Sequence, residues 1–143
     1  MAIKKNGSTG SNDKAYRILE DRDFSSIRCN STRRIEIDPH QIRNPDLGGK
    51  SGLDKMVKTF QKLFSERELC VPDIRYFGRG VLFTFKKPDY VVERKKISAV
   101  PTTLRVSITG DNGTTRTELF ANGDWDYFPT LKRVLDDYLK LAT

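Results

Sequence analysis

The architecture of this 143-residue chain is most legible in residues 74–87, Ile74-Arg-Tyr-Phe-Gly-Arg-Gly-Val-Leu-Phe-Thr-Phe-Lys-Lys87. Two runs rich in aromatic and branched residues, 74–77 and 81–86, flank Gly78-Arg79-Gly80, and glycine favours the backbone angles of a tight turn. The stretch therefore predicts two antiparallel strands joined by a hairpin. It also mixes cations with aromatic rings, a combination suited to nucleic acid because cations neutralise phosphates while rings stack on bases.

Further strands are expected on both sides of this hairpin. Within 33–38, Ile35 and Ile37 alternate with polar residues, which is typical of a half-buried strand, and Asp111-Asn112-Gly113 is a strong hairpin turn. The candidate strands in chain order are 15–20, 24–29, 33–38, 74–77, 81–86, 90–97, 104–109 and 116–120. Short strands separated by turn signals favour an antiparallel sheet.

Two segments have apolar residues at helical spacing. The first helix is expected over about residues 52–67, and its opposite face carries the lysine stripe Lys55, Lys58 and Lys62. The second is expected over about 126–141, with Pro129 in the first turn, where its missing N–H costs nothing.

These elements predict an α+β fold. We expect a mostly antiparallel, twisted sheet of five to seven strands, with one mid-chain helix and one C-terminal helix packed on one face. Residues 1–13 are rich in Gly, Ser, Asn and Lys and are expected to form a flexible basic arm, whereas 14–143 form a single domain. The other face of the sheet is expected to carry much of the positive charge.

The charge of the chain is concentrated in its centre. The sequence has 26 Lys and Arg against 19 Asp and Glu, a net charge of +7, and residues 74–110 hold eight basic and two acidic residues. A concentrated positive field attracts polyanions. We therefore expect a nucleic-acid-binding protein rather than an enzyme, which contacts mainly the phosphate backbone with limited sequence specificity. The sequence leaves DNA or RNA, and single or double strand, open.

The candidate binding residues follow from this charge distribution. The main set consists of cations in and around the predicted meander, which are Arg75, Arg79, Lys86, Lys87, Arg94, Lys95, Lys96 and Arg105. Lys55, Lys58 and Lys62 are a second, separate patch. Phe77 and Tyr76 are the stacking candidates, and Phe77 qualifies if it shares the open face of the sheet with Arg75.

Two other functions fit parts of the sequence. Asp73 after Pro72, followed by Glu93 and Lys95, resembles the PD-(D/E)xK arrangement of metal-dependent nucleases, in which two carboxylates hold Mg²⁺ and the lysine stabilises charge. Glu66 or Glu68 would supply an additional acid. The second alternative is a non-enzymatic assembly subunit of a viral or other large particle, with a homo-oligomer or an assembly partner in place of nucleic acid.

Several classes of protein are not expected. No apolar run approaches the roughly 20 residues that cross a bilayer, and no apolar signal segment precedes the domain, so we expect an intracellular protein, cytoplasmic or nuclear, that is not secreted. Cys29 and Cys70 are expected to be small core residues. A metal site on one face of a strand would need ligands at every second position, as in Glu36, Asp38 and His40. Pro39 interrupts this strand before His40, so no such site is expected. No metal or other cofactor is expected.

Overall fold

A computed structural model describes residues 15–22, 30–49, 52–86, 102–110, 115–124 and 128–143 of the chain. The elements in chain order are β1 (Tyr16–Arg22), β2 (Asn30–Ile37), a 3-10 turn η1 (Pro45–Gly48), α2 (Asp54–Glu66), β3 (Asp73–Phe77), β4 (Gly80–Phe85), β5 (Thr102–Thr109), β6 (Arg116–Asp124) and α3 (Phe128–Ala142). The predicted arm over 1–13 and the predicted strands 24–29 and 90–97 lie outside the described residues.

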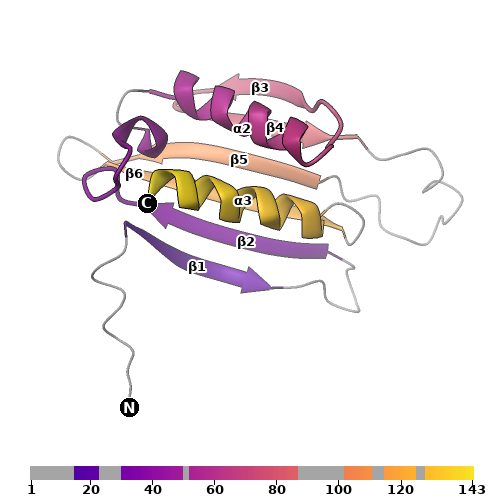
Figure 1. The fold of residues 1–143 in the computed structure, drawn as a ribbon, viewed down its shortest axis with the longest axis horizontal. Coiled ribbons are helices and arrows are strands. Elements are labelled where there is room, and N and C mark those ends of the chain that lie inside the picture. The colour runs from indigo at the N-terminus through magenta and orange to yellow at the C-terminus, as the bar shows by residue number, and fades with distance from the viewer. Residues whose placement is uncertain (1–14, 23–29, 50–51, 87–101, 111–114, 125–127) are drawn as a thin grey trace, which may run out of the picture.

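The six strands form one antiparallel sheet in the order β1-β2-β6-β5-β4-β3. Strands β3 to β6 are a meander of consecutive neighbours, and β2 pairs with β6 to attach the β1–β2 hairpin. The segment that contains α2 therefore carries the chain from the β2 side of the sheet to its far edge (Figure 1). The predicted α+β class is confirmed. Because β4 pairs directly with β5, no strand lies between them in the sheet.

Both helices lie on the same face of the sheet, as predicted (Figure 1). Alternate residues of the strands, among them Ile35, Phe83 and Leu119, are fully buried beneath them. The Phe60 ring of α2 stacks on the Tyr138 ring of α3 with their centroids 4.0 Å apart. This face, which we call the covered face, contains the hydrophobic core.

Tyr138 is the polar exception in this core. Its hydroxyl donates a hydrogen bond of 2.6 Å to the carbonyl oxygen of Leu47 in η1, so the buried O–H has a partner. Burial raises the pKa of the Tyr138 hydroxyl above its ordinary value, because the phenolate would lose its hydration.

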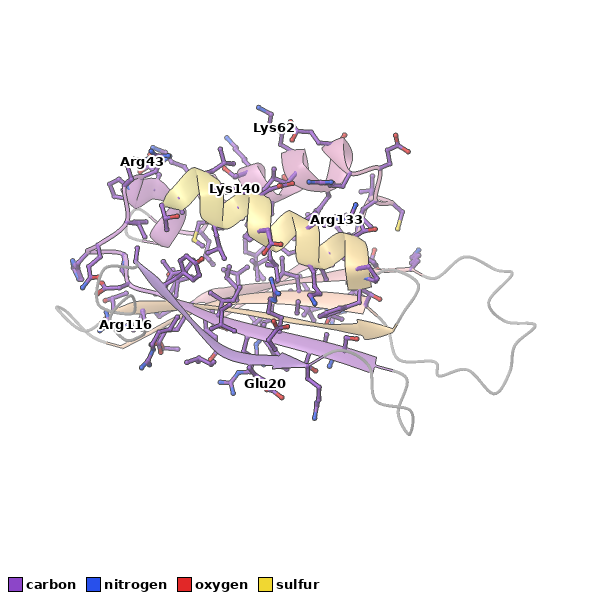
Figure 2. The ribbon with its side chains drawn as sticks, turned by 60° about the horizontal axis from the view of Figure 1, so that its bottom comes forward. Glu20, Arg43, Lys62, Arg116, Arg133 and Lys140 are labelled. Atoms are coloured by element: carbon purple, nitrogen blue, oxygen red, sulfur yellow. The ribbon has the colours of Figure 1, made fainter. Side chains whose placement is uncertain are left out.

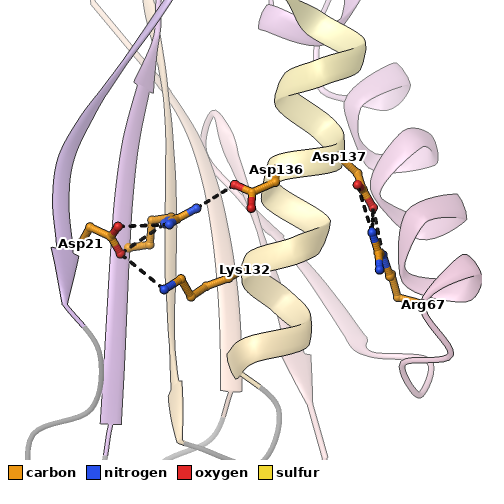
Figure 3. A network of polar contacts seen from close by, with 6 residues as sticks. Asp21, Arg67, Lys132, Asp136 and Asp137 are labelled. Carbon is orange, nitrogen blue, oxygen red and sulfur yellow. Dashed lines mark hydrogen bonds and ion pairs between the residues drawn. The ribbon is translucent and has the colours of Figure 1, made fainter.

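Charged side chains fasten α3 to its neighbours (Figure 3). Arg33 of β2, only 9% exposed, donates from Nη1 to Asp136 of α3 at 2.9 Å and from Nη2 to Asp21 of β1 at 3.0 Å. Lys132 lies 3.8 Å from Asp21. On the other side of α3, Asp137 accepts two hydrogen bonds from Arg67 at the end of α2. The covered face is thus bordered by ion pairs that tie helices and strands together.

One expected core residue lies elsewhere. Cys70 is exposed, in the loop between α2 and β3, so its prediction as a core residue is wrong. The helix ends at Glu66, and Glu68 adopts a left-handed conformation with a φ of 60°, which turns the chain before the strand begins. Cys29 lies outside the described residues. None of the helices in the described ranges is long and apolar enough to cross a membrane.

Candidate nucleic-acid interface

The face of the sheet opposite the helices, which we call the open face, has no described element packed on it. In Figure 2 the helices lie on one side of the sheet, and side chains project from its other side, where Glu20 is labelled. Residues directly opposite each other in an antiparallel pair share a face, so the register defines rows that cross the sheet. The central row of the open face runs Glu20, Arg34, Phe120, Arg105, Leu82 and Arg75.

Phe120 lies in this central row, on β6, between two arginines. The guanidinium carbon of Arg34 is 5.8 Å from the Phe120 ring centroid, and that of Arg105 is 5.1 Å away. Both lie within the distance at which a cation is attracted to the face of an aromatic ring. Strands β2 and β5 border β6 on its two sides, so their arginines bracket the ring.

The arginines beside Phe120 share one carboxylate. Glu118, two residues before Phe120 on the same face, accepts from Arg34 at 2.7 Å and lies 3.6 Å from Arg105. The hydrogen bond and the charge of Glu118 raise the pKa of Arg34. The carboxylate therefore orients the two guanidinium groups while it offsets part of their charge.

The rest of the open face is also of mixed charge. Arg17 pairs with Glu36 at 2.7 Å, and Arg116 pairs with Asp38 at 3.1 Å. The described residues of the open face carry cations and carboxylates in nearly equal number, so the expected concentration of positive charge is not found among them. Each exposed pair of this kind adds little stability, because water screens it, but it fixes the position of the arginine.

The structure places Arg75 and Phe77 together on the open face, at the outer strand β3. Arg75 is opposite Leu82, and Phe77 is opposite Gly80. A methyl group at Gly80 would lie 3.0 Å from the Phe77 ring, so the absence of a side chain lets the ring lie over the backbone. Tyr76 is opposite the buried Val81, on the side of the covered face, and is 54% exposed.

Two of the remaining predicted residues, Arg79 and Lys86, flank β4 at its two ends. Arg79 lies in the β3–β4 turn, where its Nη1 donates to the Gly110 carbonyl oxygen at 2.8 Å. Lys86 is exposed just after β4. The other four candidates of the meander, Lys87, Arg94, Lys95 and Lys96, lie outside the described residues.

The lysine stripe of α2 belongs to the opposite side of the molecule from the open face. Lys55, Lys58 and Lys62 are exposed, and Lys55 pairs with Asp46 at 3.0 Å. In Figure 2 Lys62 is labelled on the helix side of the sheet. One ligand lying flat on the open face cannot reach this stripe as well.

The nuclease hypothesis stays a prediction. Asp73 is exposed at the start of β3, whereas Glu93 and Lys95 lie outside the described residues. Glu66 and Glu68 are exposed near the end of α2. Within the described ranges, no group of three or more His, Cys, Asp or Glu side chains could hold a metal ion. The set Glu36, Asp38 and His40 therefore forms no such group either.

Sequence reasoning missed Phe120 and Arg34 as site residues. The alternation in Arg116–Asn122 carries the signal: Thr117, Leu119 and Ala121 are buried, so Phe120 must face the other way. Arg34 follows from the same reasoning in β2, where Ile35 is buried. The sequence does not show that these two residues are neighbours, because β2 and β6 are distant in the chain.

The register of the sheet and the distances between Phe120, Arg34 and Arg105 define the candidate interface. No protein-family model, curated protein or solved structure matches this chain.

Proposed function

We propose that the protein binds single-stranded nucleic acid on the open face of its sheet. The surface is a sheet face, which suits unpaired bases that lie flat, rather than an element that protrudes into a groove of a duplex. Six strands about 4.8 Å apart give the central row a width of roughly 24 Å, which is wide enough for several nucleotides. The net charge of +7 favours encounter with a polyanion.

The observation that carries the proposal is the position of Phe120 between Arg34 and Arg105. Phe120 lies on a sheet face with no described element packed on it, and a base stacks on its ring when one of the two guanidinium groups moves off the ring. The two guanidinium groups, at 5.8 and 5.1 Å from its centroid, are placed to contact the phosphates on either side of a stacked base. Phe77, over Gly80 at one edge, supplies a second ring on the same face.

The ion pairs of the open face are compatible with this function. Glu118 holds Arg34 and Arg105 near the ring in the free protein. Both arginine side chains keep about 40% of their surface exposed, 39% for Arg34 and 42% for Arg105. A phosphate can therefore approach them directly, and Arg75, which has no ion-pair partner among the described residues, adds a cation at the end of the row.

The proposal is tested by fluorescence anisotropy with labelled single- and double-stranded oligonucleotides at low and physiological salt. We expect saturable binding that prefers single strands and weakens with salt. The variant Phe120→Ala should lose about 5- to 150-fold in affinity, which corresponds to about 1–3 kcal/mol for one stacked base. Leu141→Ala is the matched control, because Leu141 is an exposed apolar residue on α3 and its loss should leave affinity unchanged.

Three results would contradict the proposal. The first is absence of binding at low salt, and the second is an equal loss of affinity in Phe120→Ala and Leu141→Ala. The third is Mg²⁺-dependent cleavage of the oligonucleotide that disappears in Glu93→Ala, which would favour the nuclease instead.

A further inference from the structure

We propose that two copies of this chain pair through their β3 strands to form a homodimer with one continuous antiparallel sheet. The inference goes beyond nucleic-acid binding and does not depend on it. It rests on the exposed edge strand, on the charge pattern of that strand and on a cavity beside it.

The two edges of the sheet differ in how well they can accept another strand. The pairing of β1 with β2 shifts register between Ile18 and Glu20, and such a bulge interrupts the ladder and discourages further pairing. The pairing of β3 with β4 is regular from Asp73 to Phe77, and β4 is its only partner among the described strands. The β3 edge is therefore the better template for an added strand.

The β3 edge also exposes apolar side chains. Val71, just before the strand, is 88% exposed, Tyr76 is 54% exposed and Phe77 is 42% exposed. These three residues lie at the two ends of one short segment, so one partner strand can cover all of them. Strand β1 exposes Ile18 and Leu19 too, but at the bulge itself.

The charges of β3 select one symmetric register. With a two-fold axis through Ile74, each Asp73 lies opposite Arg75 of the second copy, on the same face, so two opposite-charge pairs form. The neighbouring symmetric registers that keep the faces aligned place Arg75 opposite Arg75, or Asp73 opposite Asp73. Only the register through Ile74 joins opposite charges, and this complementarity identifies a second copy of the chain as the partner.

The same register pairs the exposed apolar residues with one another. Val71 comes opposite Phe77 on the side of the open face, and Pro72 comes opposite Tyr76 on the side of the covered face. A cavity of about 260 Å³ lies at this point, lined by Phe64 and Pro72 among others. Because Pro72 lines this cavity and lies opposite Tyr76 of the second copy in this register, the Tyr76 side chain of the second copy would lie beside the cavity.

The dimer would join the two open faces into a single surface. Because the two-fold axis is perpendicular to the sheet, both helix layers stay on the same side. The central rows of the two copies then lie on one surface of twelve strands, two sets of the six observed. A ligand bound by one copy could extend to the other, with the gain in avidity that two linked sites provide.

The test measures the mass of the full chain by sedimentation equilibrium, without nucleic acid, from about 1 µM to about 1 mM. We expect a dimer within this range. Asp73→Arg and Arg75→Asp should each weaken dimerisation about tenfold or more, because like charges replace both ion pairs, and the double variant should restore it. Tyr76→Ser should weaken dimerisation as well, and Arg17→Asp on the β1 edge should leave it unchanged.

Circular dichroism of each variant establishes that it is folded before its mass is interpreted. A wild-type protein that stays monomeric at about 1 mM would overturn the proposal. So would a folded double variant that fails to recover the dimer, or an Arg17→Asp variant that dissociates as readily as Asp73→Arg. Failure to bind oligonucleotides leaves these outcomes unaffected, so the dimer and the proposed function are judged separately.

Discussion

Phe83 and Phe120 belong to the same sheet but lie on its opposite faces. Phe83, on β4, is fully buried and contacts the rings of Phe60 and Phe64, at centroid distances of 6.1 and 5.1 Å. Phe120, on β6, is only partly buried and has arginines around its ring. Phe83 stabilises the fold because it packs in the core. Phe120 lies outside the core, so core packing does not account for an aromatic residue at this position. The contrast therefore separates residues that hold the fold from residues available to a ligand.

Consecutive arginines of β2 show the same contrast. Arg33 points into the covered face and Arg34 into the open face, since neighbouring strand residues face opposite ways. Burial acts to lower the pKa of Arg33, but its hydrogen bonds and the charges of Asp21 and Asp136 more than compensate and raise it. Arg34 is more exposed, and among the described residues it forms one ion pair, with Glu118 at 2.7 Å. Arg33 is a structural cation, and Arg34 is an accessible one.

The largest expected effect comes from truncating the ring on the covered face. Phe83→Ala should lower the free energy of unfolding by about 3–5 kcal/mol, because it leaves a cavity in the core. Phe120→Ala should cost about 1 kcal/mol or less, as for a residue outside the core. Urea denaturation of both variants measures the difference, and equal losses would show that the two faces do not differ as described.

The next effect separates the two arginines. Arg33→Ala should lower the free energy of unfolding by about 2–3 kcal/mol, below the 3–5 kcal/mol typical of fully buried pairs, because Asp21 and Asp136 are partly exposed. Arg34→Ala should cost less than Arg33→Ala, because Arg34 is more exposed and water screens its pair with Glu118. Arg67→Ala is the control for loss of another ion pair to α3, because it removes the Arg67–Asp137 pair of Figure 3. It should lower the free energy of unfolding by about 1 kcal/mol. A larger loss for Arg34→Ala than for Arg33→Ala would contradict the assignment.

A smaller effect distinguishes the open face from the lysine stripe. If the open face binds nucleic acid, Arg105→Ala should reduce the slope of log affinity against log salt by about one, because one phosphate contact is lost. Lys62→Ala, on α2, removes the same charge from the other side of the molecule and should leave the slope unchanged. Equal changes in both slopes would mean that binding follows net charge and not a particular face.

The smallest effect concerns the hydroxyl group within the covered face. Tyr138→Phe should lower the free energy of unfolding by about 1 kcal/mol, because the Leu47 carbonyl loses its donor. Since the pKa of Tyr138 is raised in the folded state, its contribution is fully present below about pH 10, the pKa of an unfolded tyrosine, and is lost as the pH rises above it. The free energy of unfolding, measured by urea denaturation from pH 8 to about pH 11, should therefore fall less steeply with pH for Tyr138→Phe than for wild type. Parallel pH profiles would contradict the raised pKa.

Local patterns in the sequence were sufficient for the elements but not for their arrangement. The helical spacing around Phe60 and the turn at Gly78-Arg79-Gly80 predicted α2 and the β3–β4 hairpin within two residues. The pairing of β2 with β6 has no local signal, because it joins strands far apart in the chain. The mixed charge of the open face was missed for the same reason, since Arg34 and Glu118 meet only across that pairing.

The pairing of β2 with β6 also delays the folding of β2 during synthesis of the chain. Strand β2 ends at Ile37 and β6 begins at Arg116, so about 80 residues must leave the ribosome before the two can meet. At about 5–20 residues per second this takes about 4–16 s. An isolated two-stranded hairpin is marginally stable in water, so β1 and β2 must wait for most of the chain. During this interval Ile35 and Ile37, which are buried in the folded protein, remain exposed to water. The nascent chain is then able to aggregate or to bind chaperones through these apolar residues.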